Sequence, residues 1–177
     1  GTITDGTLTQ DESTLTYTPN GDFNGSETFT YYASDSQLDS ETFTVTIIVD
    51  PDNDDPTIDS YTPNPIEYNE DESVQVTITA SDVDEDELGY TCNALGGNLT
   101  CLENGNIFTI HNNTSEHFNG DEDIEIEVTD GNGGSDLLVV TVTVISVNDV
   151  PQTFDVVVTT NEEADVLIEL STSDIEN

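Results

Sequence analysis

Carboxylate side chains gather at a few places in this 177-residue chain. Acidic residues crowd a Pro-containing stretch at residues 50–55, a short run at residues 82–87 and the sequence Asp130-Gly131-Asn132-Gly133-Gly134. Closely spaced Asp residues with Asn and Gly beside them offer the oxygens that Ca²⁺ binds, in sets of about six to eight. Mg²⁺ suits them less well, because it prefers fewer protein ligands in a stricter octahedron. The alternative is a set of solvated turns, since Asp, Asn and Gly favour turns without any metal.

The charge of the chain restricts its partners. It has 39 Asp and Glu residues and no Lys or Arg, so its formal net charge is −39. Charge of one sign opposes compaction, and cations must therefore screen or bind the carboxylates of a folded chain. Nucleic acid is excluded as a partner, because phosphate binding depends on Lys and Arg, and anionic membrane surfaces are excluded likewise. No apolar run is long enough to span a bilayer, so we expect no direct membrane insertion.

A repeat with an offset of 95 residues runs through the chain and includes the acidic stretches. Phe23-Asn24-Gly25 recurs as Phe118-Asn119-Gly120, Asp35 as Asp130, and Asn53-Asp54-Asp55-Pro56 as Asn148-Asp149-Val150-Pro151. A further match near an offset of 92 relates residues 69–84 to residues 161–176, and a longer loop at residues 61–65 accounts for the difference. A fixed offset indicates tandem modules. We predict the second half of one module at residues 1–52, a complete module at 53–148 and the opening of a third at 149–177.

Alternation of apolar and polar residues predicts β-strands throughout. Residues 74–80 and 124–128 alternate strictly, as half-buried strands do. Residues 139–145 are apolar on both faces in places, which predicts a more buried strand, and residues 137–147 form the longest predicted strand. No stretch has helical periodicity. Short strands in modules of this length predict an all-β fold of tandem antiparallel sandwiches of immunoglobulin-like type.

The cysteines and several asparagines bear on the compartment. Cys92 and Cys101 flank a Gly-Gly-centred stretch that is predicted to be a turn, so their sulfurs could face each other across a hairpin. A disulfide there would indicate an oxidising compartment, and two reduced core cysteines are the alternative. Glycosylation tripeptides, several of which arise by chance in a chain rich in Asn, Ser and Thr, begin at Asn24, Asn98, Asn112 and Asn113. These features favour an extracellular or cell-surface location.

The order of three motifs resembles a known family. The Asn-Asp-x-Pro linkers, a strand that ends in Asp82-Val83-Asp84 and the turn Val128-Thr129-Asp130-Gly131 before a long last strand are similar to the cadherin-like tandem repeats of giant bacterial and archaeal surface adhesins. The resemblance covers essentially the whole chain. It implies cadherin/Ig-like sandwiches, Ca²⁺ bound at module junctions, and adjacent repeats of the same protein as partners.

The resemblance also implies which residues would bind calcium. Carried over by position, the first junction would gather Asn53, Asp54, Asp82, Asp84 and Asp130. The second would gather Glu70, Asn148, Asp149, Asp174 and Glu176. The chain departs from the family pattern at Pro51 and Ser146, where an Asp is usual, and at the two Phe-Asn-Gly motifs, so each junction is expected to hold fewer ions.

An enzyme would need a recognisable acid–base or nucleophilic set. The only histidines are His111 and His117, and neither lies in a metal or triad pattern. His117 aligns with Asp22 of the preceding repeat, which predicts an ordinary loop residue. Carboxylate pairs hydrolyse glycosides only in a cleft, and a single sandwich of this size rarely has one. We therefore expect no enzyme and no catalytic residues.

Two structural roles remain. One is a calcium-stiffened extender, in which successive sandwiches form the rod of a surface adhesin. The other is a subunit of a self-assembling extracellular filament or surface layer, in which residues 149–177 of one copy complete residues 1–52 of the next. In that case the partners include other copies of the chain, since edge strands can extend pairing between subunits.

Overall fold

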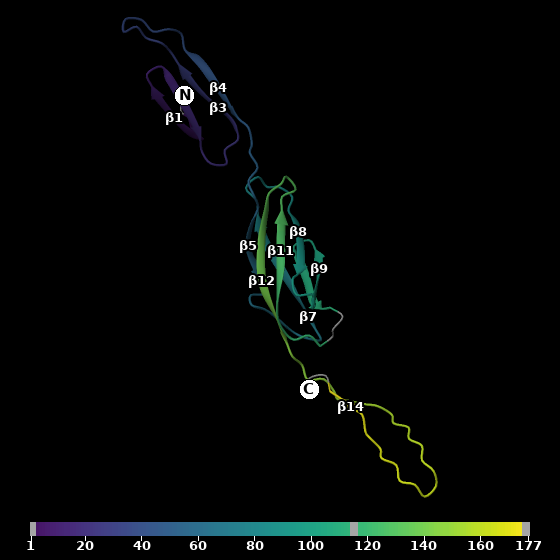
Figure 1. The fold of residues 1–177 in the computed structure, drawn as a ribbon. Helices are drawn as coiled ribbons and strands as arrows, with labels where there is room; N and C mark the ends of the chain where they lie inside the picture. The colour runs from purple at the N-terminus through teal and green to yellow at the C-terminus, as the bar shows by residue number, and fades with distance from the viewer. Residues whose placement is uncertain (1–2, 114–116, 175–177) are drawn as a thin grey trace.

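The computed structural model describes residues 3–113 and 117–174. Three parts follow one another along an elongated chain, namely two N-terminal hairpins, a central sandwich and a C-terminal segment (Figure 1). All the regular elements of the described residues are strands, which confirms the predicted all-β class. Within the same ranges, no helix has the length and apolar character needed to cross a membrane.

The N-terminal part consists of two antiparallel hairpins. Strand β1 (Gly6–Asp11) pairs with β2 (Thr14–Pro19), and β3 (Gly25–Tyr31) pairs with β4 (Phe43–Val49). The pair β3–β4 corresponds to the last two strands of the central sandwich, because β3 begins at Gly25 and its counterpart begins at Gly120. Apolar side chains of all four strands face a shared cavity of about 590 Å³.

The central sandwich has two four-stranded sheets. One has the order β5-β7-β10-β9, formed by Thr57–Thr62, Ser73–Ser81, Ile107–Asn112 and Leu99–Asn104. The other has the order β6-β12-β11-β8, formed by Ile66–Asn69, Ser135–Ile145, Gly120–Thr129 and Gly89–Ala94. The chain changes sheets between β5 and β6, where β6 pairs parallel with β12, and every other pairing in the two sheets is antiparallel.

The inner faces of both sheets make one apolar core. Side chains that are fully buried include Val76, Ile78 and Phe108 of one sheet and Ile126 and Val142 of the other. Successive side chains of a strand point to opposite faces, so the alternation in the sequence delivers every second residue of these strands to the core. Threonines and acids occupy much of the outer faces.

Strand β12 departs from the predicted burial. Its inner residues Val142 and Val144 are buried, whereas Leu137 and Val139 are 54% and 51% exposed on the outer face. The predicted strand at residues 139–145 forms, but its greater burial is not observed, because only its inner face is buried. The outer face of this sheet is not covered by any other described strand, so apolar residues there remain in solvent.

Cys92 and Cys101 form a disulfide, with Cα atoms 6.0 Å apart. The hairpin expected around it does not form, because Cys92 lies in β8 and Cys101 in β9, which belong to opposite sheets. The bond therefore joins the two layers of the sandwich at one edge.

The C-terminal segment contains one short strand pair, β13 (Gln152–Thr153) with β14 (Thr172–Ser173). At the offsets of the repeat these correspond to parts of β5 and β7. Large apolar side chains between them are exposed, among them Val157, Leu167 and Leu170 at 92%, 83% and 81%. The module limits at residues 52 and 148 remain predictions from the repeat.

Candidate metal centre

The first junction lies where the linker at residues 50–56 meets two loops of the central sandwich, at residues 82–86 and 130–134. Asn53 donates its side-chain amide to Asp130 Oδ2 at 2.7 Å, and the backbone N–H of Asp54 donates to Asp84 Oδ2 at 2.8 Å. Asp84 in turn donates its backbone N–H to Asp82 Oδ1 at 2.8 Å. The five residues predicted at this junction are therefore brought together.

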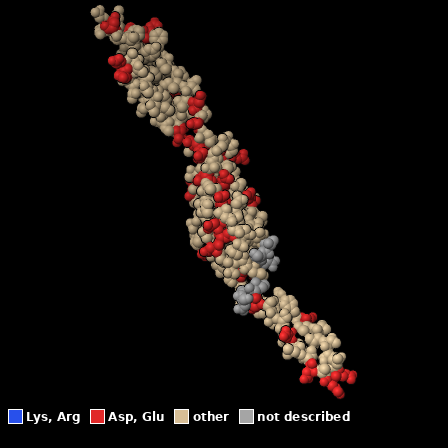
Figure 2. Space-filling view, viewed as in Figure 1, with Lys and Arg blue, Asp and Glu red and all other residues tan. Residues whose placement is uncertain are grey.

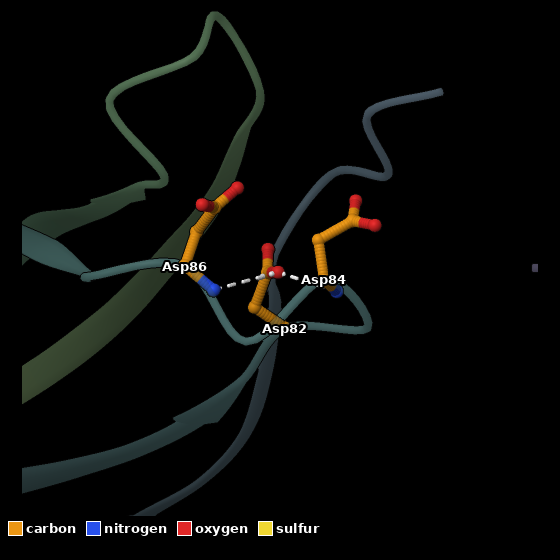
Figure 3. Close-up of side chains that lie close together, drawn as sticks. All are labelled: Asp82, Asp84 and Asp86. Atoms are coloured by element: carbon orange, nitrogen blue, oxygen red, sulfur yellow. Dashed lines mark hydrogen bonds between the residues drawn. The ribbon is translucent and has the colours of Figure 1, made fainter. Parts of the chain in front are cut away.

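Three carboxylates of the loop after β7 lie close together (Figure 3). One oxygen each of Asp82, Asp84 and Asp86 lies within 4.8 Å of the others. The backbone N–H groups of Asp84 and Asp86 both point at Asp82 Oδ1, at 2.8 and 3.3 Å. The other oxygen, Asp82 Oδ2, is enclosed and has no hydrogen-bond partner. An enclosed acceptor without a donor is the feature that a bound cation would satisfy.

A cavity of about 260 Å³ adjoins this cluster. It is lined by Asp22, Asp50, Asp52, Asp54 and Asp84 together with Asn20, Asn24 and apolar neighbours. Burial of Asp54 and the charge of the Asp22 carboxylate, followed by those of Asp84, Asp52 and Asp82, raise the pKa of Asp54 above its ordinary value. Figure 2 shows acidic side chains gathered at this narrow point, with no basic side chain beside them.

Asp130 is held differently from its neighbours. It is 4% exposed, and its Oδ1 accepts the backbone N–H groups of Asn132, Gly133 and Gly134 at 2.7–2.9 Å. The Asn53 hydrogen bond lowers its pKa, burial opposes that shift, and the backbone donors lower the pKa further. Gly134 is required here, because a Cβ atom would lie 2.6 Å from Asp55 Oδ1. Asp130 therefore stays ionised and ties the linker to the sandwich.

The second junction lies at the other end of the sandwich, around residues 145–151. Glu70 is 3% exposed, and its Oε1 accepts the backbone N–H of Val147 at 2.6 Å. Its Oε2 is enclosed without a hydrogen-bond partner. His117 lies in the loop before β11, as predicted, and its Nδ1 lies 2.8 Å from Asp149 Oδ2, although neither of these two enclosed atoms makes a hydrogen bond with a described residue.

The remaining residues predicted at this junction are less closely assembled. Asn148 donates its side-chain amide to the adjacent Asp149 carbonyl at 2.8 Å. Asp174 directly follows β14, which pairs with β13 beyond the linker. Glu176 lies outside the described residues. The structure therefore places Glu70, and His117 from the loop before β11, beside the linker that contains Asp149.

Acids outside the two predicted ligand sets occur at both the junction and the core. Asp22 and Asp52 line the junction cavity, and Asp86 belongs to the carboxylate cluster. The Asp-x-Asp spacing continues from Asp84 to Asp86 and could have indicated the last of these. Asp22 precedes the first Phe-Asn-Gly motif directly, so the repeat also marked its position.

Glu122 is a buried acid with a structural role. It is 6% exposed and accepts the backbone N–H groups of Gly96, Gly97, Asn98 and Leu99 at 3.0–3.3 Å, together with the Asn98 side-chain amide at 2.9 Å. Its counterpart Glu27, 95 residues earlier, is also 6% exposed and accepts the N–H groups of Thr4 and Asp5. A carboxylate at this point of the repeat holds the segment that precedes β9 in the central sandwich and β1 in the N-terminal part.

Two predicted glycosylation asparagines are engaged inside the fold. The Asn98 amide donates to Glu122, and the Asn112 amide donates to the Phe118 carbonyl at 2.9 Å. A glycan on either nitrogen would interfere with these bonds. Asn24 and Asn113 are exposed, whereas residues 114 and 115 of the later tripeptides lie outside the described residues.

The two packed sheets, antiparallel except for the β6–β12 pair and joined where the chain crosses between β5 and β6, define an immunoglobulin-like sandwich. A family model of the bacterial Ig domain matches residues 1–48 and 50–143. The chain belongs to this bacterial Ig domain family. The match supports an Ig-like repeat, and the narrower cadherin-like resemblance is considered with the proposed function.

Comparisons with other proteins add little about activity. Among solved structures, the chain is similar to an endo-fucoidan hydrolase, MfFcnA4 of glycoside hydrolase family 107, with a TM-score of 0.39 and 18% identity over 82% of this chain and 23% of that chain. A single-substitution variant of that hydrolase gives a TM-score of 0.37 and 21% identity with the same coverage. These likenesses are too weak to carry an argument about chemistry. No curated protein matches the chain.

Proposed function

We propose that this chain is a structural repeat of an extracellular surface adhesin, in which calcium bound at the module junctions stiffens successive sandwiches into a rod. The observation that carries the proposal is the first junction. There, three carboxylates converge within 4.8 Å, and the enclosed oxygen Asp82 Oδ2 has no partner. No Lys or Arg exists anywhere in the chain to neutralise them.

The donor set suits a hard cation that prefers oxygen. Asp82, Asp84 and Asp86 would hold the ion through carboxylate oxygens, and Asp54 and Asp22 lie across the adjoining cavity. Ca²⁺ accepts such sets in flexible geometry, whereas Mg²⁺ requires a stricter octahedron. Bound calcium would supply positive charge between carboxylates that otherwise repel one another. Burial, and after it the charges of these carboxylates, raises the pKa of Asp54.

Other observations support the location and the non-catalytic role. The Cys92–Cys101 disulfide is consistent with an oxidising compartment, and bacterial Ig domains are commonly found at the cell surface. Function must be argued from a site, and the acids of this chain form a junction between modules. We therefore propose a structural spacer with no reaction of its own.

Calcium titration of the purified chain tests the proposal. Calorimetry should show binding, and one ion at about 100-fold excess over its Kd should stabilise the fold by about 2.7 kcal/mol. Chelation should lower the Tm and broaden the distribution of molecular dimensions measured by solution X-ray scattering. A double variant Asp82→Asn/Asp84→Asn should lose the response, whereas Glu125→Gln/Glu127→Gln removes the same charge from β11 and should keep it. No heat and no Tm change would refute the calcium site.

A second candidate function is self-assembly into a filament. The apolar cavity of the N-terminal hairpins, lined by Leu8, Leu15, Tyr17 and Phe29 among others, is uncovered. The exposed apolar residues at 154–170 correspond to the region of β5–β7, which in the central sandwich pairs with β10 and β12, the counterparts of β2 and β4. Residues 150–173 of a second copy are the occupant that this correspondence favours. Sedimentation over a wide concentration range tests this, and a monomer at every concentration would eliminate it.

A further inference from the structure

Enclosed polar atoms that lack a hydrogen bond occur at both junctions. Within the described ranges, Asp82 Oδ2 is such an atom at the first junction, and Glu70 Oε2 and His117 Nδ1 are such atoms at the second. Glu70 itself is only 3% exposed. A buried polar atom is costly unless a donor, a water or a cation satisfies it. These atoms therefore indicate a bound ligand at the second junction as well.

The contact between His117 and Asp149 indicates what kind of ligand this is. Nδ1 of His117 lies 2.8 Å from Oδ2 of Asp149, but no hydrogen bond joins the two atoms. A hydrogen bond requires the N–H group to point at its acceptor. Two atoms that bind one metal ion point at the ion instead, and if each lies about 2.1 Å from Zn²⁺ they are about 3.0 Å apart at a right angle. The short contact therefore has the geometry of two neighbouring metal ligands.

The repeat places this pair where the first junction has two carboxylates. Asp22 and Asp54 line the cavity of the first junction, and their counterparts 95 residues later are His117 and Asp149. An imidazole nitrogen thus replaces a carboxylate oxygen at an equivalent place. Imidazole suits Zn²⁺ and related transition metals, whereas carboxylates suit Ca²⁺. The exchange therefore changes which ion the junction favours.

The second linker also offers fewer oxygens than the first. Three acids of the first linker are replaced 95 residues later by apolar side chains, so that Asp50, Asp52 and Asp55 correspond to Ile145, Val147 and Val150. Ca²⁺ takes about six to eight oxygen ligands, whereas Zn²⁺ takes about four ligands. A donor set that loses carboxylates and gains an imidazole therefore fits a transition metal better than calcium.

Glu70 lies at the edge of this donor pair. Its Oε1 accepts the N–H of Val147, two residues before Asp149, at 2.6 Å. Glu70, His117 and Asp149 do not form one group within 4.8 Å of the kind found at the first junction. Direct contact with the ion therefore falls to His117 and Asp149. A water molecule on the ion would donate to Glu70 Oε2, as acidic partners behind a metal site commonly accept from its ligands.

We propose that the second junction binds a transition-metal ion of the zinc class through His117 Nδ1 and Asp149 Oδ2, with Glu70 positioning a metal-bound water. The inference rests on the proposed role of bound cations at module junctions, and it changes the ion that the second junction selects. The bound metal would tie the loop before β11 to the linker at residues 145–151. One rod would then depend on two metals, calcium at the first junction and zinc at the second.

Zinc titration of the whole 177-residue chain tests the proposal. Calcium is kept in large excess to occupy the carboxylate sites, and the two cysteines cannot bind zinc because they are joined in a disulfide. Calorimetry should show one zinc ion per chain. The chain has only two histidines, so NMR of their rings should show His117 signals that shift as zinc binds and His111 signals that do not.

Matched variants locate the zinc ion. His117→Asn should lower the zinc affinity by more than about tenfold, and His117→Asp, which restores the acid of the first junction, should lower it likewise and add a second calcium-binding heat. Glu70→Gln should cost about tenfold in zinc affinity. Glu67→Gln removes the same charge from an exposed position of β6 and should leave zinc binding unchanged. Each of these variants should keep the calcium response of the first junction.

The variant Asp82→Asn/Asp84→Asn separates the two metal sites, because it should lose calcium binding at the first junction and keep zinc binding. Loss of both would place zinc at the first junction and overturn the inference, while the first junction stands as a cation site. Absence of a zinc heat, or a shift of the His111 signals in place of those of His117, would overturn the inference equally. If the native chain binds zinc at His117 but no calcium, the proposed calcium site fails and the zinc site stands.

Discussion

Replacement of Glu122 by Gln should destabilise the central sandwich strongly, although it exchanges only one oxygen for nitrogen. Glu122 Oε1 accepts the N–H groups of Gly96, Gly97 and Leu99 at 3.1, 3.0 and 3.3 Å. Its Oε2 accepts the backbone and side-chain N–H groups of Asn98 at 3.0 and 2.9 Å. A glutamine can present its carbonyl to one of these sets only, and its NH₂ group then faces the donors of the other.

The expected loss follows from the number of donors left without an acceptor. If the glutamine carbonyl takes the place of Oε1, the two donors of Asn98 lose theirs. An unsatisfied buried donor costs about 1–3 kcal/mol, and because Asn98 is half-buried the lower end applies to each. The three remaining bonds also lose their charge-assisted strength, for roughly 1 kcal/mol together. The sum is about 3 kcal/mol, or roughly 10–20 °C in Tm for a domain of this size.

Scanning calorimetry and urea unfolding at a fixed calcium concentration measure this loss. Glu125→Gln is the control, because it removes the same charge from the same strand on the opposite face and should change stability by about 0.5 kcal/mol or less. A Glu122→Gln variant within about 1 kcal/mol of that control would refute the structural role of the carboxylate.

The pH dependence gives an independent check on Glu122. Burial raises the pKa of its carboxyl, but the hydrogen bonds from Asn98, Leu99 and Gly96 outweigh burial, and the pKa lies below the ordinary value of 4.5. A carboxyl whose pKa is lower in the folded state stabilises the fold above pH 4.5, and this stability is lost as the pH falls through the folded pKa. The native chain should therefore lose stability faster than Glu122→Gln on acidification below 4.5. Parallel curves would contradict the assignment.

Two further substitutions test the packing of the first junction and of β12. Gly134→Ala should lower the stability by about 1–3 kcal/mol and weaken calcium binding, because the added Cβ would lie 2.6 Å from Asp55 Oδ1. The control is Gly21→Ala, whose Cβ would meet no atom within 4 Å. It should change neither stability nor calcium binding in the same thermal and calorimetric assays. Val142→Ala should cost about 2–3 kcal/mol of stability in urea unfolding, because its side chain is fully buried. Val139→Ala, on the exposed face of the same strand, should cost less than about 1 kcal/mol. Equal losses would mean that both faces of β12 are packed.

The composition of the first junction was predicted from the resemblance to cadherin-like repeats, carried over by position. Asn53 and Asp130 are 77 residues apart, yet their side chains meet at 2.7 Å. The 95-residue offset alone marks equivalent positions in successive modules and does not show which of them lie together. Alternation identified the inner residues of β7 and β11, since a half-buried strand must place every second side chain in the core.

Alternation identifies a face of a strand but not the sheet to which the strand belongs. The turn between Cys92 and Cys101 therefore suggested a hairpin, whereas β8 and β9 lie in opposite sheets. The same limit explains β12, where apolar residues on both faces at 139–145 predicted a more buried strand, although no described strand covers the outer residue Val139. Partners across a sandwich are set by tertiary packing, which no local period records.

Glu122 was missed for a different reason. It shares the parity of Ile124 and Ile126, so the alternation already placed its side chain on the inner face. A buried acid is costly unless it is hydrogen-bonded, and its donors come from a loop about 25 residues earlier in the chain. The one available signal was the recurrence of Glu27 as Glu122 at the repeat offset, which marks a position that the fold needs.

Two uses of carboxylates together account for how a chain without Lys or Arg folds. Glu122 and Asp130 are surrounded by backbone N–H groups and an Asn amide, which replace basic side chains and lower the pKa of each acid. Burial and the charges of nearby carboxylates, that of Asp22 first, raise the pKa of Asp54. The opposite shifts distinguish acids whose charge the protein's own donors stabilise from one whose charge they do not. The raised pKa of Asp54 and the enclosed oxygen of Asp82, which lacks a donor, lie at the same junction, and both support the proposed calcium site there.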